Sequence, residues 1–249
     1  MKQYLENKDF DIIVTPHLYP AETLTWMKRK GILRQKTVAI ATDYTSIPFW
    51  EETECDYYVI PHEDLINEFV SGVLPRKTGS LGGFGQRNVG RRLGGKKGQR
   101  NLSAASRRLD LSCNEWKYGI WKDPDFVLEL ARRLKENEEI VVICGNNKKL
   151  EETLKENLEG IEGYASLVSQ SRWQSTWKRV TSFLTKPGGL SSTEAAVSRI
   201  PIIHTNPIPG CENRNLEFFE ERHMSIGTKE FAWTTEGWTE DFGERKIAP

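Results

Sequence analysis

The chain has 249 residues, 37% of them hydrophobic, so it is long and apolar enough to build a core and is not disordered throughout. No stretch approaches the roughly 18 consecutive apolar residues of a membrane span, and the first residues lack the apolar centre of a signal peptide, so we expect a cytoplasmic protein. Four widely spaced cysteines without a C-x-x-C pair favour reduced thiols over a disulfide framework or a zinc knuckle.

The first part of the chain, residues 1–74, alternates strand-like and helix-like patterns. Short apolar runs end in turn signals, and a helix-forming stretch ends with a Gly where a C-cap would lie. Strands are predicted at 11–17, 36–43 and 57–61, and helices at 21–31 and 63–70. Continuous apolar strands that alternate with helices predict a parallel sheet covered by helices.

The segment that follows is strongly basic. Between Phe69 and Leu109 lie 41 residues with ten Lys or Arg and no Asp or Glu, so this stretch carries +10 and the rest carries 25 − 35 = −10. The stretch is dense in Gly and shows neither a helical nor a strand period. We therefore predict a disordered, Gly/Arg-rich segment over 75–122, and the zero net charge of the chain is the sum of two unlike parts.

The pattern of strands and helices resumes in residues 123–230. Strands are predicted at 140–145, 183–187 and 201–204, and helices at 126–136, 148–158, 192–198 and 212–222. The tail, 231–249, is expected to be irregular. In parallel sheets, ligands bind beyond the carboxyl ends of the strands, where the turns lie.

Two of these turns suggest a binding site. In the first, paired glycines at Gly188 and Gly189 let a ligand approach the backbone, and the following helix offers free N–H groups to a phosphate. Glu194 lies close enough to accept hydrogen bonds from a ribose. The alternative is that the glycines only form a tight turn and Glu194 only favours the helix start. The second turn, 206–215, is a Pro-Gly loop that enters a helix, and by itself it is weak evidence for ligand contact.

Five motifs in the same order resemble the processive diacylglycerol glucosyltransferases and monogalactosyldiacylglycerol synthases of glycosyltransferase family 28. The motifs are Asp43-Tyr44-Thr45 with Pro48-Phe49-Trp50, Cys55 to Pro61, Val142 to Asn147, Thr185 to Leu190 with Glu194, and Asn206 to Gly210. The resemblance covers roughly residues 9–72, 126–163 and 183–229. Its most specific parts are the TKPGG and NPIPG turns.

The resemblance implies an α/β fold of the GT-B type, with two Rossmann-like parallel-sheet domains, of which the N-terminal one is incomplete. It implies an inverting transfer of a hexose from UDP-glucose or UDP-galactose to diacylglycerol, without a metal or a cofactor besides the UDP-sugar co-substrate. The carboxy-terminal domain (123–230) would hold the donor, and residues 1–74 would belong to the acceptor side. The protein would act peripherally at the inner face of the membrane and would not bind nucleic acid.

Roles for single residues follow from the resemblance alone. Glu194 would bind the ribose, and Asn215 would contact sugar or phosphate. The predicted donor-binding residues are Lys186, Gly188, Gly189, Glu194, Gly210, Glu212 and Asn215, and the acceptor-side residues are His17 and Asp43. The general base stays unassigned, because the family's first strand and glycine-histidine loop are not found here. Cys211 and Ile47 replace the Gln and His that many relatives have.

Two segments depart from the family pattern, and we hypothesise that roughly residues 75–122 and 164–183 are translated out of frame. Residues 113–121 stand where a Gly-rich loop should open the donor domain, and permitted codons read one base later encode such a loop. Residues 164–183 lack the expected strand, which a shifted frame can also supply. Such a chain would have little or no transferase activity. Nucleotide reads with an uninterrupted frame that cannot encode these loops would refute the hypothesis.

The basic segment also has a functional interpretation, in which it is an arm that binds RNA or anionic lipid headgroups. Phe84 is its only aromatic residue between Phe69 and Leu109, so it offers no stacking platform for bases. For the chain as a whole, two further interpretations are a non-catalytic remnant and a GT-B transferase with a polyprenyl-linked acceptor.

Overall fold

A computed structural model describes most of the predicted elements. The described residues are 1–6, 9–72, 107–112, 125–134, 138–144, 147–161, 164–167, 180–205 and 207–227. The chain divides into two compact units, the first within residues 1–93 and the second within 94–249.

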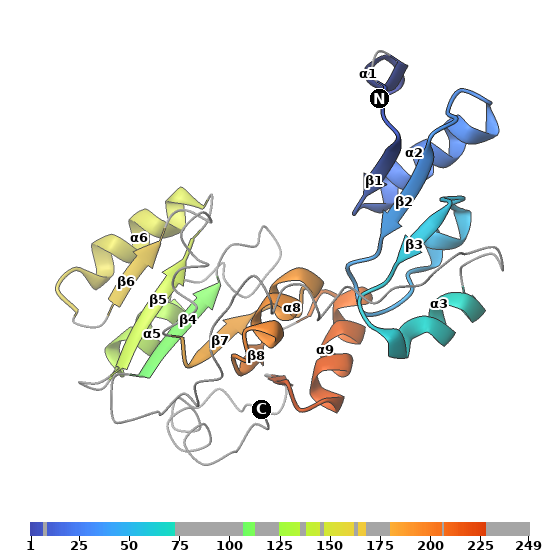
Figure 1. The fold of residues 1–249 in the computed structure, drawn as a ribbon. Helices are drawn as coiled ribbons and strands as arrows, with labels where there is room; N and C mark the ends of the chain where they lie inside the picture. Colours follow the sequence, from blue (N-terminus) through green and yellow to red (C-terminus); the bar gives the residue numbers. More distant parts are fainter. Residues whose placement is uncertain are drawn as a thin grey trace, which may run out of the picture. The chain divides into compact units, whose positions relative to one another are not determined.

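The first unit contains a three-stranded parallel sheet in the order β1-β2-β3 (Figure 1). Its strands are β1 (Ile12–Thr15), β2 (Lys36–Ile40) and β3 (Tyr57–Val59). Its helices are α1 (Lys2–Glu6), α2 (Leu18–Arg29), the 3-10 helices η1 (Pro48–Glu52) and η2 (Glu63–Leu65), and α3 (Ile66–Gly72). The predicted strands and the first predicted helix are confirmed.

Helix α2 packs its apolar side against one face of this sheet. Leu24 and Met27 are almost fully buried and cluster with Leu33. The helix ends where Gly31 adopts a positive φ of 68°, and the Gly31 amide bonds the Lys28 carbonyl, as a C-cap glycine does. The pleat of β1 alternates its side chains, and Ile12 is 56% exposed on the face away from α2.

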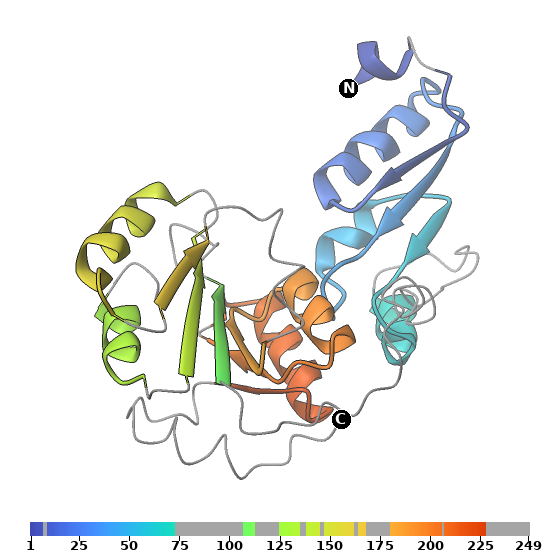
Figure 2. The ribbon, with the colours of Figure 1, turned by 60° about the vertical axis from the view of Figure 1, so that its left-hand side comes forward.

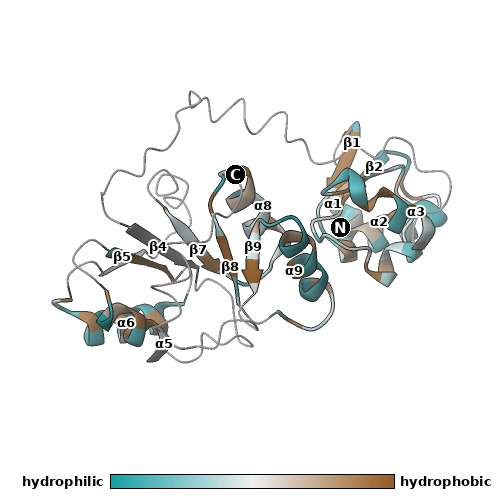
Figure 3. Cartoon of the chain, turned by 90° about the horizontal axis from the view of Figure 1, so that it is seen from below, coloured by the Kyte–Doolittle hydropathy of each residue, from teal (hydrophilic) through white to brown (hydrophobic). Residues whose placement is uncertain are grey.

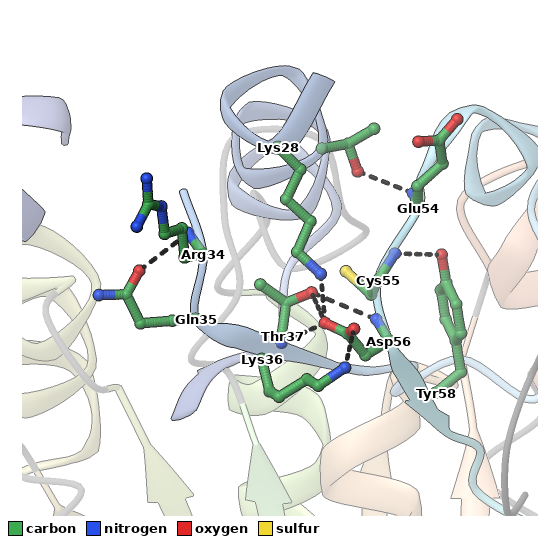
Figure 4. A network of polar contacts seen from close by, with 10 residues as sticks. Lys28, Arg34, Gln35, Lys36, Thr37, Glu54, Cys55, Asp56 and Tyr58 are labelled. Carbon is green, nitrogen blue, oxygen red and sulfur yellow. Dashed lines mark hydrogen bonds and ion pairs between the residues drawn. The ribbon is translucent and has the colours of Figure 1, made fainter. Parts of the chain in front are cut away.

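A polar network centred on Asp56 fastens the start of β3 to β2 and α2 (Figure 4). The Asp56 carboxylate accepts hydrogen bonds from the Thr37 amide at 2.8 Å and the Thr37 hydroxyl at 3.1 Å. It also pairs with the ammonium groups of Lys28 and, at 3.0 Å, Lys36. Partial burial alone would raise the pKa of Asp56, but the hydrogen bonds from Lys28, Thr37 and Lys36 outweigh it and hold this pKa well below its usual range.

We expect Asp56→Ala to lower the free energy of unfolding by about 2 kcal/mol, because several hydrogen-bond donors lose a charged acceptor. The folded-state pKa is depressed, so this stabilisation is present above the unfolded pKa of about 3.9 and is lost as the pH falls through and below it. Urea unfolding at pH 7 and pH 3 measures both effects. Glu54→Ala is the control, because the Glu54 ion pair with Arg29 is exposed and should change stability little. An equal loss in both variants would contradict this account.

The second unit contains a six-stranded parallel sheet in the order β6-β5-β4-β7-β8-β9. Its strands are β4 (Arg107–Ser112), β5 (Glu138–Ile143), β6 (Tyr164–Leu167), β7 (Ser182–Thr185), β8 (Ile202–His204) and β9 (Ser225–Gly227). Its helices are α5 (Asp125–Arg132), α6 (Lys148–Leu158), α8 (Gly189–Val197) and α9 (Cys211–Glu221).

The strand order reverses between β4 and β7. Crossovers between parallel strands are right-handed, so the reversal places α5 and α6 on one face of the sheet and α8 and α9 on the other. Figure 2 shows the two pairs of helices on different sides of the sheet. A reversal of this kind is the topological switch point at which open α/β sheets bind ligands.

Apolar side chains from helices and strands meet in the core of this unit. In α6, Leu150, Leu154 and Leu158 recur every four residues and are all buried, which is the pattern of an amphipathic helix. The buried cluster comprises Val127, Leu128, Leu130, Ala131, Ile140, Val142, Cys144, Leu150, Leu154, Leu158, Leu184 and Ile203. In Figure 3, β8 and β9 carry hydrophobic colour and α9 is largely hydrophilic.

Two sequence predictions are wrong in this unit. Residues 107–112, expected to be disordered within 75–122, form β4, a central strand paired with β5 and β7. Leu109 and Leu111 alternate with polar residues, a strand period that the basic neighbourhood obscured. Residues 164–167, expected to lack a strand, form β6 beside β5. The rest of the basic segment (75–106 and 113–122) and the tail (231–249) lie outside the described residues.

Candidate functional site

The predicted glycine turn lies at the end of β7, beside the switch point. The Gly188 amide bonds the Lys186 carbonyl at 2.7 Å, which makes a tight turn. Gly188 is the N-cap of α8, and no side chain caps this helix, which begins at Gly189 rather than at the predicted Ser192. The first amides of a helix have no partner within it, so the start of α8 presents N–H groups and a positive dipole end.

Lys186 stands at the entrance to this turn. The residue is only 4% exposed. Among the described parts of the chain, no acidic side chain pairs with it and no acceptor bonds its ammonium group. A positive charge that no described residue pairs with, next to the free amides at the start of α8, makes the turn suited to an anion.

Because α8 begins at Gly189, Glu194 lies in its second turn rather than its first, and it is exposed to solvent. Partial desolvation of its carboxyl group by the surrounding protein raises the pKa of Glu194. Its side chain is free of any ion pair or hydrogen bond with the described residues. Binding of a ribose by this carboxylate stays a prediction.

The second turn leads into α9. Gly210 has φ 114° and ψ −120°, a backbone conformation that only glycine adopts readily. The Glu212 carboxylate, 9% exposed, accepts a hydrogen bond from the Ile208 amide at 2.5 Å. Glu212 therefore holds the loop in shape, and a direct contact of Gly210 or Glu212 with a donor stays a prediction.

Asn215 connects the two turns. Its side chain is fully buried, and its amide nitrogen donates a hydrogen bond to the Pro187 carbonyl at 2.9 Å, 28 residues away in sequence. The structure thus brings Asn215 into contact with the backbone of the glycine turn. This position favours a role in holding the turn over the predicted contact with sugar or phosphate.

His204 is the last residue of β8, and the sequence analysis did not predict a role for it. The residue is 0% exposed, and a hydrogen bond of 2.8 Å joins its Nε2 to the hydroxyl of Ser192 in α8. Burial lowers the pKa of His204 to about 3, so the imidazole is neutral at physiological pH.

The two predicted acceptor-side residues lie in the first unit. His17 follows β1 and Asp43 follows β2, at the carboxyl ends of neighbouring parallel strands. The His17 Nδ1 accepts the Tyr19 amide at 3.3 Å and caps α2, so in the neutral imidazole the proton resides on Nε2. A general base at His17 would have to give up this cap, and the role of both residues stays a prediction.

Within the described ranges, no group of three or more His, Cys, Asp or Glu side chains could hold a metal ion. None of the helices described here is long and apolar enough to cross a bilayer.

Comparison with known proteins confirms the resemblance inferred from the motifs. Residues 1–82 match the family model of monogalactosyldiacylglycerol (MGDG) synthase. The chain is 23% identical over 210 residues to a processive diacylglycerol beta-glucosyltransferase of Staphylococcus carnosus, a match covering 83% of the chain and 53% of that protein. It is 36% identical over 97 residues to the enzyme of the same name from Bacillus cereus, covering 36% of the chain and 24% of the relative. The chain therefore spans about half the length of the Staphylococcus relative.

Solved structures confirm the α/β fold of the GT-B type. A structure of S. aureus MnaA with UDP aligns with a TM-score of 0.67 at 11% identity, over 96% of this chain and 68% of that one. Acinetobacter baumannii MurG aligns with a TM-score of 0.58 at 12% identity, over 97% of this chain and 66% of the other.

Proposed function

We propose that the chain is a UDP-sugar-dependent hexosyltransferase that glycosylates diacylglycerol at the inner surface of a membrane. The similarity to processive diacylglycerol beta-glucosyltransferases supports the reaction and the acceptor. The match of residues 1–82 to the MGDG synthase model supports an acceptor-side role for the first unit. Glucose and galactose donors are both compatible with these matches.

The observation that carries the proposal is the positive charge at the glycine turn, which no described residue neutralises. Lys186 is buried without a partner among the described residues, and it precedes a helix whose first amides have no side-chain cap. A diphosphate would supply the missing negative charge and accept these N–H groups. The turn also lies at the switch point of the sheet, where nucleotides bind in folds of this class.

The proposed chemistry is a single displacement at the anomeric carbon. The acceptor hydroxyl oxygen forms a bond to C1 of the hexose while the bond from C1 to the UDP oxygen breaks, so the configuration inverts. Lys186 and the amides at the start of α8 stabilise the negative charge that develops on the departing UDP. The proton of the acceptor hydroxyl passes to a general base. No described residue is assigned this role.

The expectation of little or no activity is the alternative to this proposal, and one of its reasons no longer holds. That expectation assumed a sheet without two of its strands, whereas β4 and β6 are both present and paired. The described sheet of the second unit therefore gives no structural reason for a failure to bind the donor.

The proposal is tested by incubating the full chain with labelled UDP-glucose or UDP-galactose and vesicles that contain diacylglycerol. Glycosyl-diacylglycerol formed from either donor supports the proposal. UDP binding without product would indicate a non-catalytic remnant, and transfer only to a polyprenyl-linked acceptor would replace the proposed acceptor. Binding of neither UDP nor UDP-sugar would contradict the proposal.

We expect Glu194→Ala to weaken UDP binding by about tenfold, because a charged acceptor for the ribose hydroxyls is lost. Pyrophosphate, which has no ribose, should bind the variant as well as the unaltered chain. Calorimetric titration with both ligands measures the difference. Glu217→Ala is the matched control, since Glu217 is exposed on α9 and pairs with Arg214. Equal losses for UDP and pyrophosphate would exclude the ribose role.

A further inference from the structure

A buried polar pair, Ser192 and His204, underlies the first turn of α8. Both residues are 0% exposed, and 2.8 Å separates Ser192 Oγ from His204 Nε2. His204 is in register with Thr185, the last residue of β7. The pair therefore links α8, the helix that starts at the glycine turn, to β8. Strand β8 lies beside β7, the strand that leads into the turn.

This polar pair is energetically unfavourable compared with apolar side chains in a core. The His204 Nδ1 is buried and has no hydrogen-bond partner among the described residues. On another side the imidazole meets the ring of Phe219 edge-on, with centroids 5.7 Å apart. Two apolar side chains could occupy the same space without leaving a polar atom unsatisfied. The hydrogen bond thus fixes the orientation of the two side chains more than it adds net stability to the fold.

The pair orients the backbone amides at the start of α8, which are the groups proposed to bind the diphosphate. The Ser192 amide is the first in α8 to find a backbone acceptor, the Gly188 carbonyl at 3.1 Å. Fixing Ser192 therefore fixes Gly188 and the amides of 189–191 that precede it in the helix. A second buried link, from Asn215 to the Pro187 carbonyl, holds the turn from the side of α9.

We propose that Ser192 and His204 are positioning residues, whose hydrogen bond sets the first turn of α8 so that its amides are preorganised for a diphosphate. This inference rests on the proposed function, because the diphosphate is that of the UDP-sugar. Preorganised donors bind an anion more tightly than mobile ones, since less ordering is required upon binding.

The test compares four variants of the full chain by UDP titration at pH 7.5 and by urea unfolding. Ser192→Ala and His204→Leu should weaken UDP binding by about threefold to tenfold. His204→Gln keeps an amide nitrogen at the distance of Nε2 and should restore binding to within about twofold of the unaltered chain. Ser225→Ala is the control, because Ser225 is a buried serine of β9 without a bonded hydroxyl among the described residues. A Ser192→Ala chain that is less stable but binds UDP normally would overturn the proposal.

Hydrogen exchange separates this inference from the proposed function. In the absence of ligand, Ser192→Ala should speed exchange at the amides of 189–192 and leave those of α6 unchanged. If the unaltered chain binds no UDP, the proposed function fails, and the exchange rates still decide whether the pair positions the turn. Unchanged exchange at 189–192 would overturn the positioning role.

Discussion

Replacing Lys186 with Met should weaken the binding of UDP by about tenfold to a hundredfold, the equivalent of one charge-assisted hydrogen bond to the diphosphate. The same substitution should leave the free energy of unfolding unchanged or raise it. The reason is that Lys186, 4% exposed, forms no ion pair or side-chain hydrogen bond with the described residues, so the substitution removes no described polar contact. Calorimetric titration with UDP and urea unfolding measure the two quantities.

Lys155→Met is the matched control for this experiment. Lys155 pairs with Glu151 on α6, on the other face of the sheet from α8. The control should bind UDP as the unaltered chain does. If Lys186→Met loses stability and keeps its affinity, Lys186 is a structural residue and the proposed anion site is wrong.

His204 should make the protein sensitive to mild acid. Its folded-state pKa, about 3, lies below the unfolded value of 6.5, so between these values the unfolded chain takes up a proton that the folded chain does not. The free energy of unfolding should therefore fall as the pH drops below about 6.5, by up to about 1.4 kcal/mol per pH unit. Between pH 7 and pH 5 this contribution amounts to about 2 kcal/mol.

Comparison with His204→Leu isolates this contribution. The variant should lose less stability than the unaltered chain between pH 7 and pH 5, because it lacks the buried imidazole that resists protonation. Urea unfolding at the two pH values measures both slopes. Parallel slopes in the two proteins would show that His204 protonates in the folded state and is not buried as described.

The strands with continuous apolar runs could be predicted from the sequence, because burial on both faces of a parallel sheet demands such runs. Residues 36–40 and 202–204 are examples, and both are strands in the structure. Strand β4 was missed because eight positive charges precede the alternation at 107–112 and two more, Arg107 and Arg108, begin it. Strand β9 contains a single apolar residue, Ile226, between Ser225 and Gly227, so it shows no apolar run.

The candidate site was only partly predictable for a different reason. The glycine turn is local, since Gly188 and Gly189 adjoin the helix that they start, and sequence alone indicated it. Contacts that support the turn are not local. Asn215 bonds Pro187 across 28 residues and Ser192 bonds His204 across 12, and only the folded sheet brings these side chains together.

The reading-frame hypothesis loses part of its support. It rested partly on a missing strand in 164–183 and on the irregularity of 75–122. Strands β6 and β4 now lie within these segments, each paired in parallel with β5. The hypothesis stays a prediction for both segments, of which residues 75–106, 113–122 and 168–179 lie outside the described residues, and the nucleotide sequence of the gene tests it directly.

The central claim is that the turn between β7 and α8 binds the diphosphate of a UDP-sugar. Hydrogen exchange of the full chain with and without saturating UDP tests it most directly. The account predicts slower exchange of the amides of 188–192 upon UDP binding, with no change in α2 of the first unit. Binding of UDP without protection of 188–192, or no binding at all, would contradict it.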